Sequence, residues 1–259
     1  MIDSHCHLGF DHADITDTLS RAEKVGVSEM LTVACSCDEY EDLLLILNKY
    51  PMIYGAFGIH PEYAASMPSV ADMIKRLSAH PNILAVGECG LDYHYNSDTK
   101  EIQRSTFWRQ IEIASQLKKP LIIHAREADE DIISILDRAN RSGLLTAGGV
   151  LHCFTGTQKL ADKALDIGFY ISASGVITFK NAEDIRSVFK TVPLDRLLLE
   201  TDSPYMAPIP YRGKVNEPSF MVKTAEKLAE IKGVSLNEID EITTQNFYKL
   251  FKKEGLNEG

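Results

Sequence analysis

Histidines and carboxylates stand at the ends of several short apolar segments in this chain. The first such group is His5 and His7, which occur one residue apart in "MIDSHCHL". In a β-strand the side chains of residues i and i+2 project from the same face, so these two imidazoles would lie side by side. Imidazole nitrogens that converge on one point are typical of a metal site. The alternative for this pair alone is two surface histidines near a chain terminus.

Four more polar residues occupy the same kind of position. Glu88 follows "ILAVG", His124 follows "LII", His152 follows "VL", and Asp202 follows "LLLET". Taken singly, either histidine is more typical of a hydrogen-bonded core residue, and Asp202 could cap a turn together with Ser203. An ionised carboxylate at the end of an apolar strand, however, needs a compensating charge. Six such residues at the same ends of their strands favour one metal centre over independent structural roles.

The elements that must position these residues are short apolar segments rich in strand-forming residues. They span residues 1–7, 29–36, 52–60, 82–90, 120–127, 149–156, 169–175 and 196–203, each followed by a polar or helix-like segment. Near-continuous apolar strands that alternate with helices predict a parallel sheet covered on both faces. Eight such units predict a (β/α)8 TIM barrel, formed by a single domain over residues 1–259.

Two further features refine this fold prediction. No GxGxxG turn follows the first apolar segment, which disfavours an open dinucleotide-binding sheet. The last third of the chain contains two helix-like segments, 219–233 and 236–253, which is one helix more than eight units need.

In such a barrel the active site lies at the carboxyl ends of the strands, so the six polar residues should share one mouth. Six nitrogen and oxygen donors exceed the four of a tetrahedral zinc site and suit two divalent ions that share a carboxylate. Glu88 is the expected bridge, because it follows a central strand. The expected division is His5, His7, Glu88 and Asp202 for one ion, and Glu88, His124 and His152 for the other. The ions could be Mg, Mn, Zn or Co.

The cysteines are expected to be structural. Their number is odd, five in all, and no CxxC pair occurs, which favours free thiols in a reducing cytosol. Because side chains alternate along a strand, Cys6, Cys89 and Cys153 should point away from the mouth, toward the helices. Cys35 and Cys37 are predicted to pack in the core, because neither has a neighbouring base.

Charge and hydropathy exclude some classes of partner. The net charge of −10 argues against a protein that grips long duplex nucleic acid through a broad basic surface. The end of a polyanion is compatible, since a bound metal supplies local positive charge. No apolar run approaches the roughly 18 residues that cross a bilayer. Asp3 stands where a secretory signal would carry basic residues. We therefore expect a cytoplasmic protein with no membrane association and no obligate protein partner.

Six motifs, in this order, resemble the TatD-type metal-dependent deoxyribonucleases of the amidohydrolase superfamily. They are "DSHCHL", "GIHPEY", "GECGLDY", "IIHARE", "LHCFTG" and "LETDSPY", and the likeness continues into "RGKVNEPSF" and "TTQNFYKLF". The resemblance implies a (β/α)8 barrel, two divalent ions and hydrolysis of ester bonds, notably removal of nucleotides from the 3′ end of DNA. The implied partner is therefore DNA, as a single strand or a 3′ end. The family's metal ligands fall on the six residues named above.

The six-residue set, taken together with this resemblance, suggests roles for single residues. Glu88 and Asp202 would be catalytic, with Asp202 accepting the proton of the attacking water while it also binds metal. Val215 departs from the family pattern, because a basic residue is expected there, and it leaves one positive charge fewer near the mouth.

Two residues near the mouth are candidates for substrate binding. His60 closes the third strand in "GIHPEY", where it would either contact a phosphate or stabilise a turn. Arg126 lies two residues beyond His124 and would either pair bidentately with a phosphate or form an ion pair with Glu127 or Asp129. An aromatic residue of the segment 93–95, beyond Glu88, could stack on an exposed base.

Two other functions stay open on the sequence alone. The same barrel could hydrolyse another ester or a cyclic amide, for example as an aminoacyl-tRNA deacylase. Glu88 as the bridge, in place of the lysine that is often carbamylated in amide-cleaving relatives, favours phosphoesters. A noncatalytic metal-bound nucleic-acid binder is disfavoured, because no ligand is lost and no basic face is evident.

Overall fold

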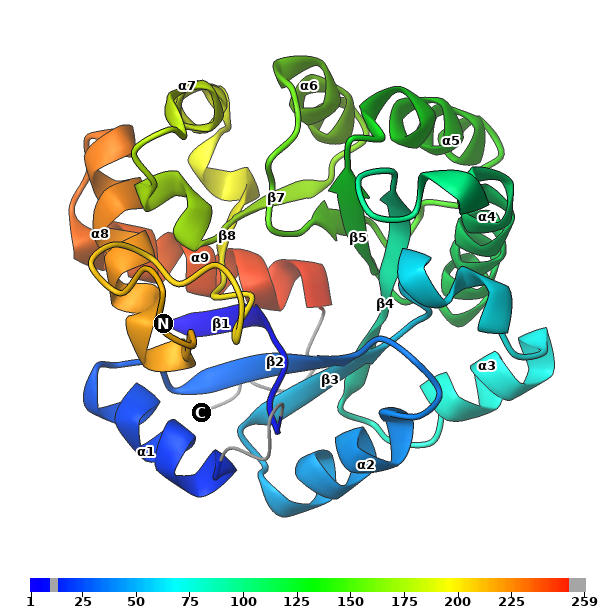
Figure 1. Ribbon diagram of the computed structural model, residues 1–259, viewed down its shortest axis with the longest axis horizontal. Helices are drawn as coiled ribbons and strands as arrows, with labels where there is room; N and C mark the ends of the chain where they lie inside the picture. The colour runs from blue at the N-terminus through cyan, green and yellow to red at the C-terminus, as the bar shows by residue number, and fades with distance from the viewer. Residues whose placement is uncertain (10–13, 252–259) are drawn as a thin grey trace.

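Eight parallel strands follow the order of the chain around a barrel in the computed structural model (Figure 1). They are β1 (Ile2–Cys6), β2 (Glu29–Ala34), β3 (Ile53–Phe57), β4 (Ile83–Asp92), β5 (Leu121–Arg126), β6 (Gly149–Leu151), β7 (Tyr170–Ala173) and β8 (Leu197–Leu199). Seven of the eight apolar segments contain one of these strands, and β4 runs two residues beyond the fourth segment. The predicted (β/α)8 TIM barrel is confirmed. The structure describes residues 1–9 and 14–251, so the end of the helix expected over 236–253 lies outside the described residues.

The first and last strands meet through residues that follow them. Cys6 and Ser203 form a parallel bridge. The amide of Asp202 donates to the carbonyl of His5 at 2.9 Å, and the amide of His7 donates to the carbonyl of Ser203 at 2.8 Å. These bonds bring the segment that contains both histidines against the segment that contains Asp202, although almost the whole chain separates them.

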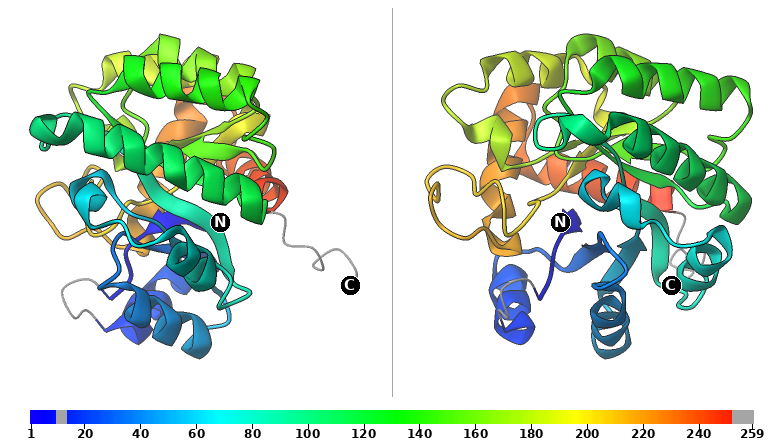
Figure 2. Two further views of the ribbon diagram at one scale, coloured as in Figure 1. Left: turned by 90° about the vertical axis from the view of Figure 1, so that its right-hand side faces the viewer. Right: turned by 45° about the vertical axis from the view of Figure 1, so that its right-hand side comes forward.

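Helices surround the strands on the outside of the barrel, as Figures 1 and 2 show. They are α1 (Ile15–Lys24), α2 (Tyr40–Lys49), α3 (Val70–Leu77), α4 (Lys100–Leu117), α5 (Asp129–Arg141), α6 (Gln158–Asp166), α7 (Glu183–Thr191), α8 (Met221–Lys232) and α9 (Leu236–Phe251). Short 3₁₀ segments are η2 (Pro61–Ser66), η3 (Ser97–Thr99), η4 (Gly175–Thr178), η5 (Leu194–Arg196) and η6 (Pro218–Phe220). Side chains of Asp14, Ser69 and Thr157 cap α1, α3 and α6 by accepting backbone N–H bonds that would otherwise be unsatisfied.

Helix α9 is the extra helix that the sequence predicted, and it closes one end of the barrel. Its residues Phe247, Leu250 and Phe251 join the apolar cluster that fills the barrel interior, and the ring of Phe247 lies 5.8 Å from that of Tyr54 on β3. The amide of Asn246 donates to the carbonyl of Leu197, where β8 begins. The amino ends of the strands are therefore covered by α9, and the carboxyl ends form the other mouth.

Two apolar clusters divide the core. The interior cluster takes one or two residues from each strand: Ile2, Leu31, Val33, Tyr54, Ala56, Ala85, Ile122, Val150, Tyr170 and Leu198. The larger cluster lies between the strands and the helices and includes the wholly buried Phe57, Phe107, Phe169 and Phe189. The polar residues at the carboxyl ends of the strands therefore lie next to a closely packed apolar interior. Among the described residues, no helix is both long and apolar enough to span a membrane.

Candidate metal centre

All six predicted metal ligands meet at the carboxyl-end mouth of the barrel. His5 lies on β1, Glu88 on β4 and His124 on β5, whereas His7, His152 and Asp202 follow β1, β6 and β8. Each of the four histidines has a ring nitrogen that lies 2.7 to 4.0 Å from a carboxylate oxygen of Glu88 or Asp202. The sequence prediction that they share one site therefore agrees with the geometry.

An irregularity in β1 turns the histidine pair into the mouth. Ile2 belongs to the interior cluster, but Cys6 belongs to the cluster beneath the helices, although residues four apart in a regular strand share a face. The pairing register of β1 with β2 shifts between Asp3 and Cys6, which accounts for the reversal. Irregularities of this type re-aim side chains next to active sites. Here the shift leaves the residues flanking Cys6 facing inward.

A second register shift, in β4, positions the carboxylate of Glu88. Ala85 on β4 faces the interior, whereas Cys89 packs beneath the helices. The register of β4 with β5 shifts between Val86 and Cys89. A regular strand would have pointed Glu88 outward together with Val86, so the shift is what brings the carboxylate into the mouth.

Glu88 lies between two groups of donors and is only 3% exposed. Its Oε1 lies 2.7 Å from His152 Nε2 and 2.8 Å from His124 Nδ1. Its Oε2 lies 3.4 Å from His5 Nε2 and 4.0 Å from His7 Nε2. Burial alone would raise the pKa of Glu88, but the surrounding imidazoles hold it well below its usual range. Each oxygen of one ionised carboxylate thus faces a different set of histidines.

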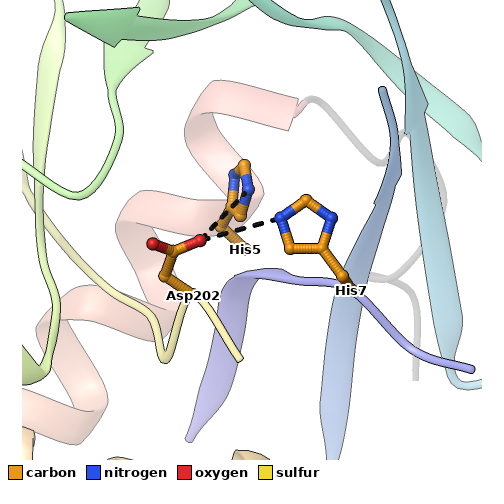
Figure 3. Close-up of side chains that lie close together, drawn as sticks. All are labelled: His5, His7 and Asp202. Carbon is orange, nitrogen blue, oxygen red and sulfur yellow. Dashed lines mark ion pairs between the residues drawn. The ribbon is translucent and has the colours of Figure 1, made fainter. Parts of the chain in front are cut away.

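The first set is His5, His7 and Asp202, which Figure 3 shows pointing toward one another. Asp202 Oδ1 lies 3.9 Å from His5 Nε2 and 3.7 Å from His7 Nε2. His5 is wholly buried, and neither of its ring nitrogens has a hydrogen-bond partner. Burial, followed by the nearby His152, lowers the pKa of His5, so its imidazole is neutral. A buried imidazole without partners is costly unless another group satisfies it.

A divalent ion fits this first set. The contacts of 3.4 to 4.0 Å are too long for hydrogen bonds. Ligands bound at about 2.0–2.1 Å around one tetrahedral ion are separated by roughly 3.3 Å, which is close to the shortest of these contacts. Nitrogen and carboxylate donors are also the types that Zn, Co and Mn accept. An ion here would satisfy His5, which nothing else among the described residues does.

The second set is His124 and His152, and each imidazole is backed by a carboxylate that the sequence analysis missed. Asp92 Oδ2 lies 3.1 Å from His124 Nε2, and Glu200 Oε1 lies 3.6 Å from His152 Nδ1. Such carboxylate partners orient a metal-binding histidine and increase its basicity. Glu200 is wholly buried, and its Oε1 also accepts the amide of Cys153. An acidic residue at the end of an apolar strand was the available signal, and both "GLD" and "LLLE" carried it.

His60 performs the turn-stabilising role and also faces the centre. Its Nδ1 accepts the amide of Glu62, which caps η2, and its Nε2 lies 3.6 Å from Glu88 Oε1. Burial lowers the pKa of His60 to about 4, so the ring is neutral. Since Nδ1 accepts a hydrogen bond, the proton is assigned to Nε2, which presents an N–H to the mouth. A donor at this position suits an anionic oxygen better than a metal ion.

Arg126 shares the inward face of β5 with His124, as alternation predicts. Its guanidinium lies over the ring of Tyr95 at 4.7 Å. The alternative ion pairs are not formed, because Glu127 pairs with His94 and Asp129 accepts the amide and hydroxyl of Thr157. Within the described residues, Arg126 has no carboxylate partner.

The cysteines only partly follow the predicted alternation. Cys6 and Cys89 pack beneath the helices as predicted. The prediction for Cys153 is wrong: β6 ends at Leu151, so alternation no longer applies, and the Cys153 thiol lies 3.1 Å from the hydroxyl of Ser174. The packing prediction for Cys35 is incomplete, because its side chain faces the interior and its Sγ lies 3.5 Å from Glu88 Oε2.

Asp3 joins the two ends of the barrel behind the first set. Its carboxylate accepts the amide of Thr201 at 2.9 Å and the hydroxyl of Thr201 at 2.6 Å. Burial raises the pKa of Asp3 to about 7. Asp202 follows this anchor with a left-handed backbone, φ 55°, a conformation that is uncommon for residues other than glycine.

Comparisons with known proteins agree with this geometry. A family profile described as TatD related DNase matches residues 2–252. An uncharacterized metal-dependent hydrolase of Escherichia coli K12, YcfH, is 43% identical over 97% of this chain and 95% of its own. A Salmonella typhimurium protein named 3′-5′ ssDNA/RNA exonuclease TatD is 31% identical over 92% of this chain and 93% of its own.

The solved structures extend the likeness to three dimensions. The crystal structure of YJJV, a TatD homologue from Escherichia coli, is similar with a TM-score of 0.91 and 29% identity, covering 97% of this chain and 98% of that one. The profile match spans almost the whole chain, and relatives well above 30% identity cover it equally. The chain therefore belongs to the TatD-related DNase family and is a metal-dependent hydrolase.

Proposed function

We propose that this protein is a two-metal phosphodiesterase that removes nucleotides from the 3′ end of single-stranded DNA. The observation that carries the proposal is the position of Glu88, whose Oε2 faces His5 and whose Oε1 faces His124 and His152. A carboxylate with each oxygen directed at a separate donor set suits a ligand shared by two ions.

The proposed ligand sets are those expected from the sequence: His5, His7, Glu88 and Asp202 for one ion, and Glu88, His124 and His152 for the other. Two such ions, when bound, would supply an activated water and neutralise charge on the phosphoryl oxygens. Asp202 would accept the proton of that water. Burial opposes ionisation of Asp202, but the nearby imidazole of His7 and the charges of His152 and His5 lower its pKa, which keeps it a carboxylate.

Arg126 and His60 would hold the substrate phosphate. A guanidinium without a carboxylate partner suits bidentate binding of a phosphate, and the His60 Nε2–H is directed at the same mouth. Both donors lie close to the ligands in a protein that is acidic overall, with a net charge of −10. One cationic and one neutral hydrogen-bond donor are thus available beside the proposed ligands.

The exposed aromatic residues support a single-stranded substrate. Among the described residues, the exposed phenylalanine, tyrosine and tryptophan side chains are Tyr63, Tyr95 and Tyr205. The Tyr205 ring contacts His7, and the Tyr63 ring contacts His60. Tyr95 lies beneath Arg126. Stacking on an aromatic side chain contributes about 1–3 kcal/mol per base. A base in a duplex does not offer its face for such stacking, so exposed tyrosines beside His7, His60 and Arg126 favour a free end.

The cysteines bear on the compartment, and the histidines bear on the metal. All five cysteines are unpaired, which suits a reducing cytoplasm, and we assign the activity to that compartment. Imidazole-rich sets favour Zn, Co or Mn, whereas Mg prefers oxygen ligands.

The test is digestion of one oligonucleotide labelled separately at each end, as a single strand and as a blunt duplex. The protein is first treated with chelator and then reconstituted with Mg, Mn, Co or Zn. We expect single nucleotides released from the 3′ end of the single strand, no release with chelator, and slower release from the duplex. An Arg126→Gln variant should raise KM about tenfold or more at unchanged metal content. An intact single strand with every metal would refute the proposal, and turnover of an aminoacyl ester or a dihydropyrimidine instead would support the other hydrolases.

A further inference from the structure

Cys35 is the one thiol that the fold directs at the central carboxylate of the described site. It directly follows β2, where Leu31 and Val33 face the barrel interior, and alternation sends Cys35 to the same face. Its amide donates to Glu39 Oε2 at 2.8 Å, and its carbonyl accepts the amide of His60 at 3.0 Å. The side chain is 8% exposed. The thiol is therefore fixed by its own backbone bonds, at the wall of the mouth.

The thiol converges with the first set of donors on one oxygen atom. Cys35 Sγ lies 3.5 Å and His5 Nε2 lies 3.4 Å from Glu88 Oε2. Donor atoms of His7, Cys35 and Glu88 all lie within 4.8 Å of one another. A thiolate bound at about 2.3 Å and an oxygen bound at about 2.0 Å to one ion are roughly 3.5 Å apart when the angle between them is near tetrahedral. The separation of this S–H···O contact therefore also fits two ligands of one ion.

His5 supplies an independent reason to expect an ion at this point. Its side chain is wholly buried, neither ring nitrogen has a hydrogen-bond partner, and its Nε2 is directed at the same oxygen as the thiol. Hydrogen bonding within the described residues leaves it unsatisfied, and coordination of Nε2 would satisfy it.

We propose that Cys35 is a ligand of the ion held by His5, His7 and Asp202. This inference rests on the proposed two-ion centre and names the class of metal at one of its positions. On binding, the S–H···O contact with Glu88 is replaced by a sulfur–metal bond, and the thiol proton passes to solvent. A thiolate selects thiophilic ions, so this position takes Zn, Co or Cd in preference to Mg or Ca, while the position facing His124 lacks sulfur.

The test is the absorption spectrum of the full chain as cobalt is added to metal-free protein. A cobalt–thiolate bond gives a charge-transfer band in the near ultraviolet that imidazole and carboxylate ligands do not give. We expect this band in the wild type, and its loss in Cys35→Ser with the visible cobalt bands retained. Cys37→Ser is the matched control, because Cys37 is a half-buried thiol two residues away and belongs to no donor group. It should keep the band.

A second measurement separates a ligand from a merely structural thiol. Competition with a chromophoric chelator should show that Cys35→Ser loses about tenfold or more in Zn affinity, about 1.4 kcal/mol, while Mg affinity is unchanged. Circular dichroism melting of both variants checks the fold. A band that persists in Cys35→Ser, that disappears only in Cys153→Ser, or that is absent from the wild type would overturn the proposal. Oligonucleotide digestion is scored separately: a band without DNA cleavage refutes only the nuclease function, and cleavage without a band refutes only the role of Cys35.

Discussion

Replacement of Glu88 by glutamine is the perturbation that bears on every part of the centre. The change keeps the shape of the side chain but removes its charge. In metal-free protein Glu88 Oε1 forms ion pairs with His152 Nε2 at 2.7 Å and with His124 Nδ1 at 2.8 Å, and Glu88 is 3% exposed. Removing one partner of a buried ion pair costs about 3–5 kcal/mol. Because the pKa of Glu88 is lowered on folding, its stabilisation is present above its ordinary value of 4.5 and is complete at neutral pH.

The same change should lower the affinity of the protein for both ions, because each ion loses an anionic ligand. We expect an affinity loss of at least about 100-fold at both positions, which is about 2.8 kcal/mol each at 1.4 kcal/mol per tenfold. Urea unfolding in chelator at neutral pH measures the first effect, and calorimetric titration of metal measures the second.

Glu130→Gln is the control, because Glu130 pairs with Lys159 at 2.8 Å on the surface and its side chain is 78% exposed. Its loss should change the free energy of unfolding by less than about 1 kcal/mol. If Glu88→Gln bound two ions with wild-type affinity, the bridging role would be wrong.

The remaining predictions concern the supporting residues. Glu200→Gln should weaken the binding of one ion about 10–100-fold and leave the other unchanged in a two-step titration, because His152 is the proposed ligand with which Glu200 forms an ion pair; equal losses would contradict this. Burial opposes the positive charge of His152, but Glu88 and Glu200 raise its pKa well above 6.5, so its stabilisation is complete below pH 6.5 and is lost as pH rises through the raised pKa. Chelated protein should therefore unfold at less urea at alkaline pH, and a constant midpoint would refute that coupling. Phe247→Ala should lower the free energy of unfolding by about 3–5 kcal/mol, because the Phe247 ring packs against Tyr54 at the closed end of the barrel. Metal binding should persist at low temperature, where the variant stays folded. An unchanged free energy of unfolding would exclude that role.

The fold and the candidate ligands could be predicted because the strand and helix periodicities of the sequence are regular. Apolar strands alternating with helices specify a parallel barrel, and the carboxyl ends of its strands share one mouth. A carboxylate that follows an apolar run, such as Glu88 after "ILAVG", needs a nearby positive group. That requirement predicted a cluster at the mouth without knowledge of which strands are neighbours.

The residues that were missed depend on features that no residue-level periodicity encodes. Glu88 itself was predicted, but the register shift that turns it inward was not, because only strand pairing reveals it. Asp92 and Glu200 act through the histidines that they contact across strands, so each looks like an isolated acid in the sequence. Cys153 lies beyond the end of β6 and adopts φ 42°, so the alternation of side chains along a strand does not predict where its thiol points. Cys35 obeys alternation, but only its position beside Glu88 gives it a chemical partner.

Anomalous diffraction from crystals soaked with cobalt is the most direct measurement of the two-ion centre. Two peaks are predicted, one beside Glu88 Oε2 and His5, and the other beside Glu88 Oε1 and His152. A single peak, or two peaks of which only one contacts Glu88, would contradict the shared carboxylate on which the proposed chemistry depends.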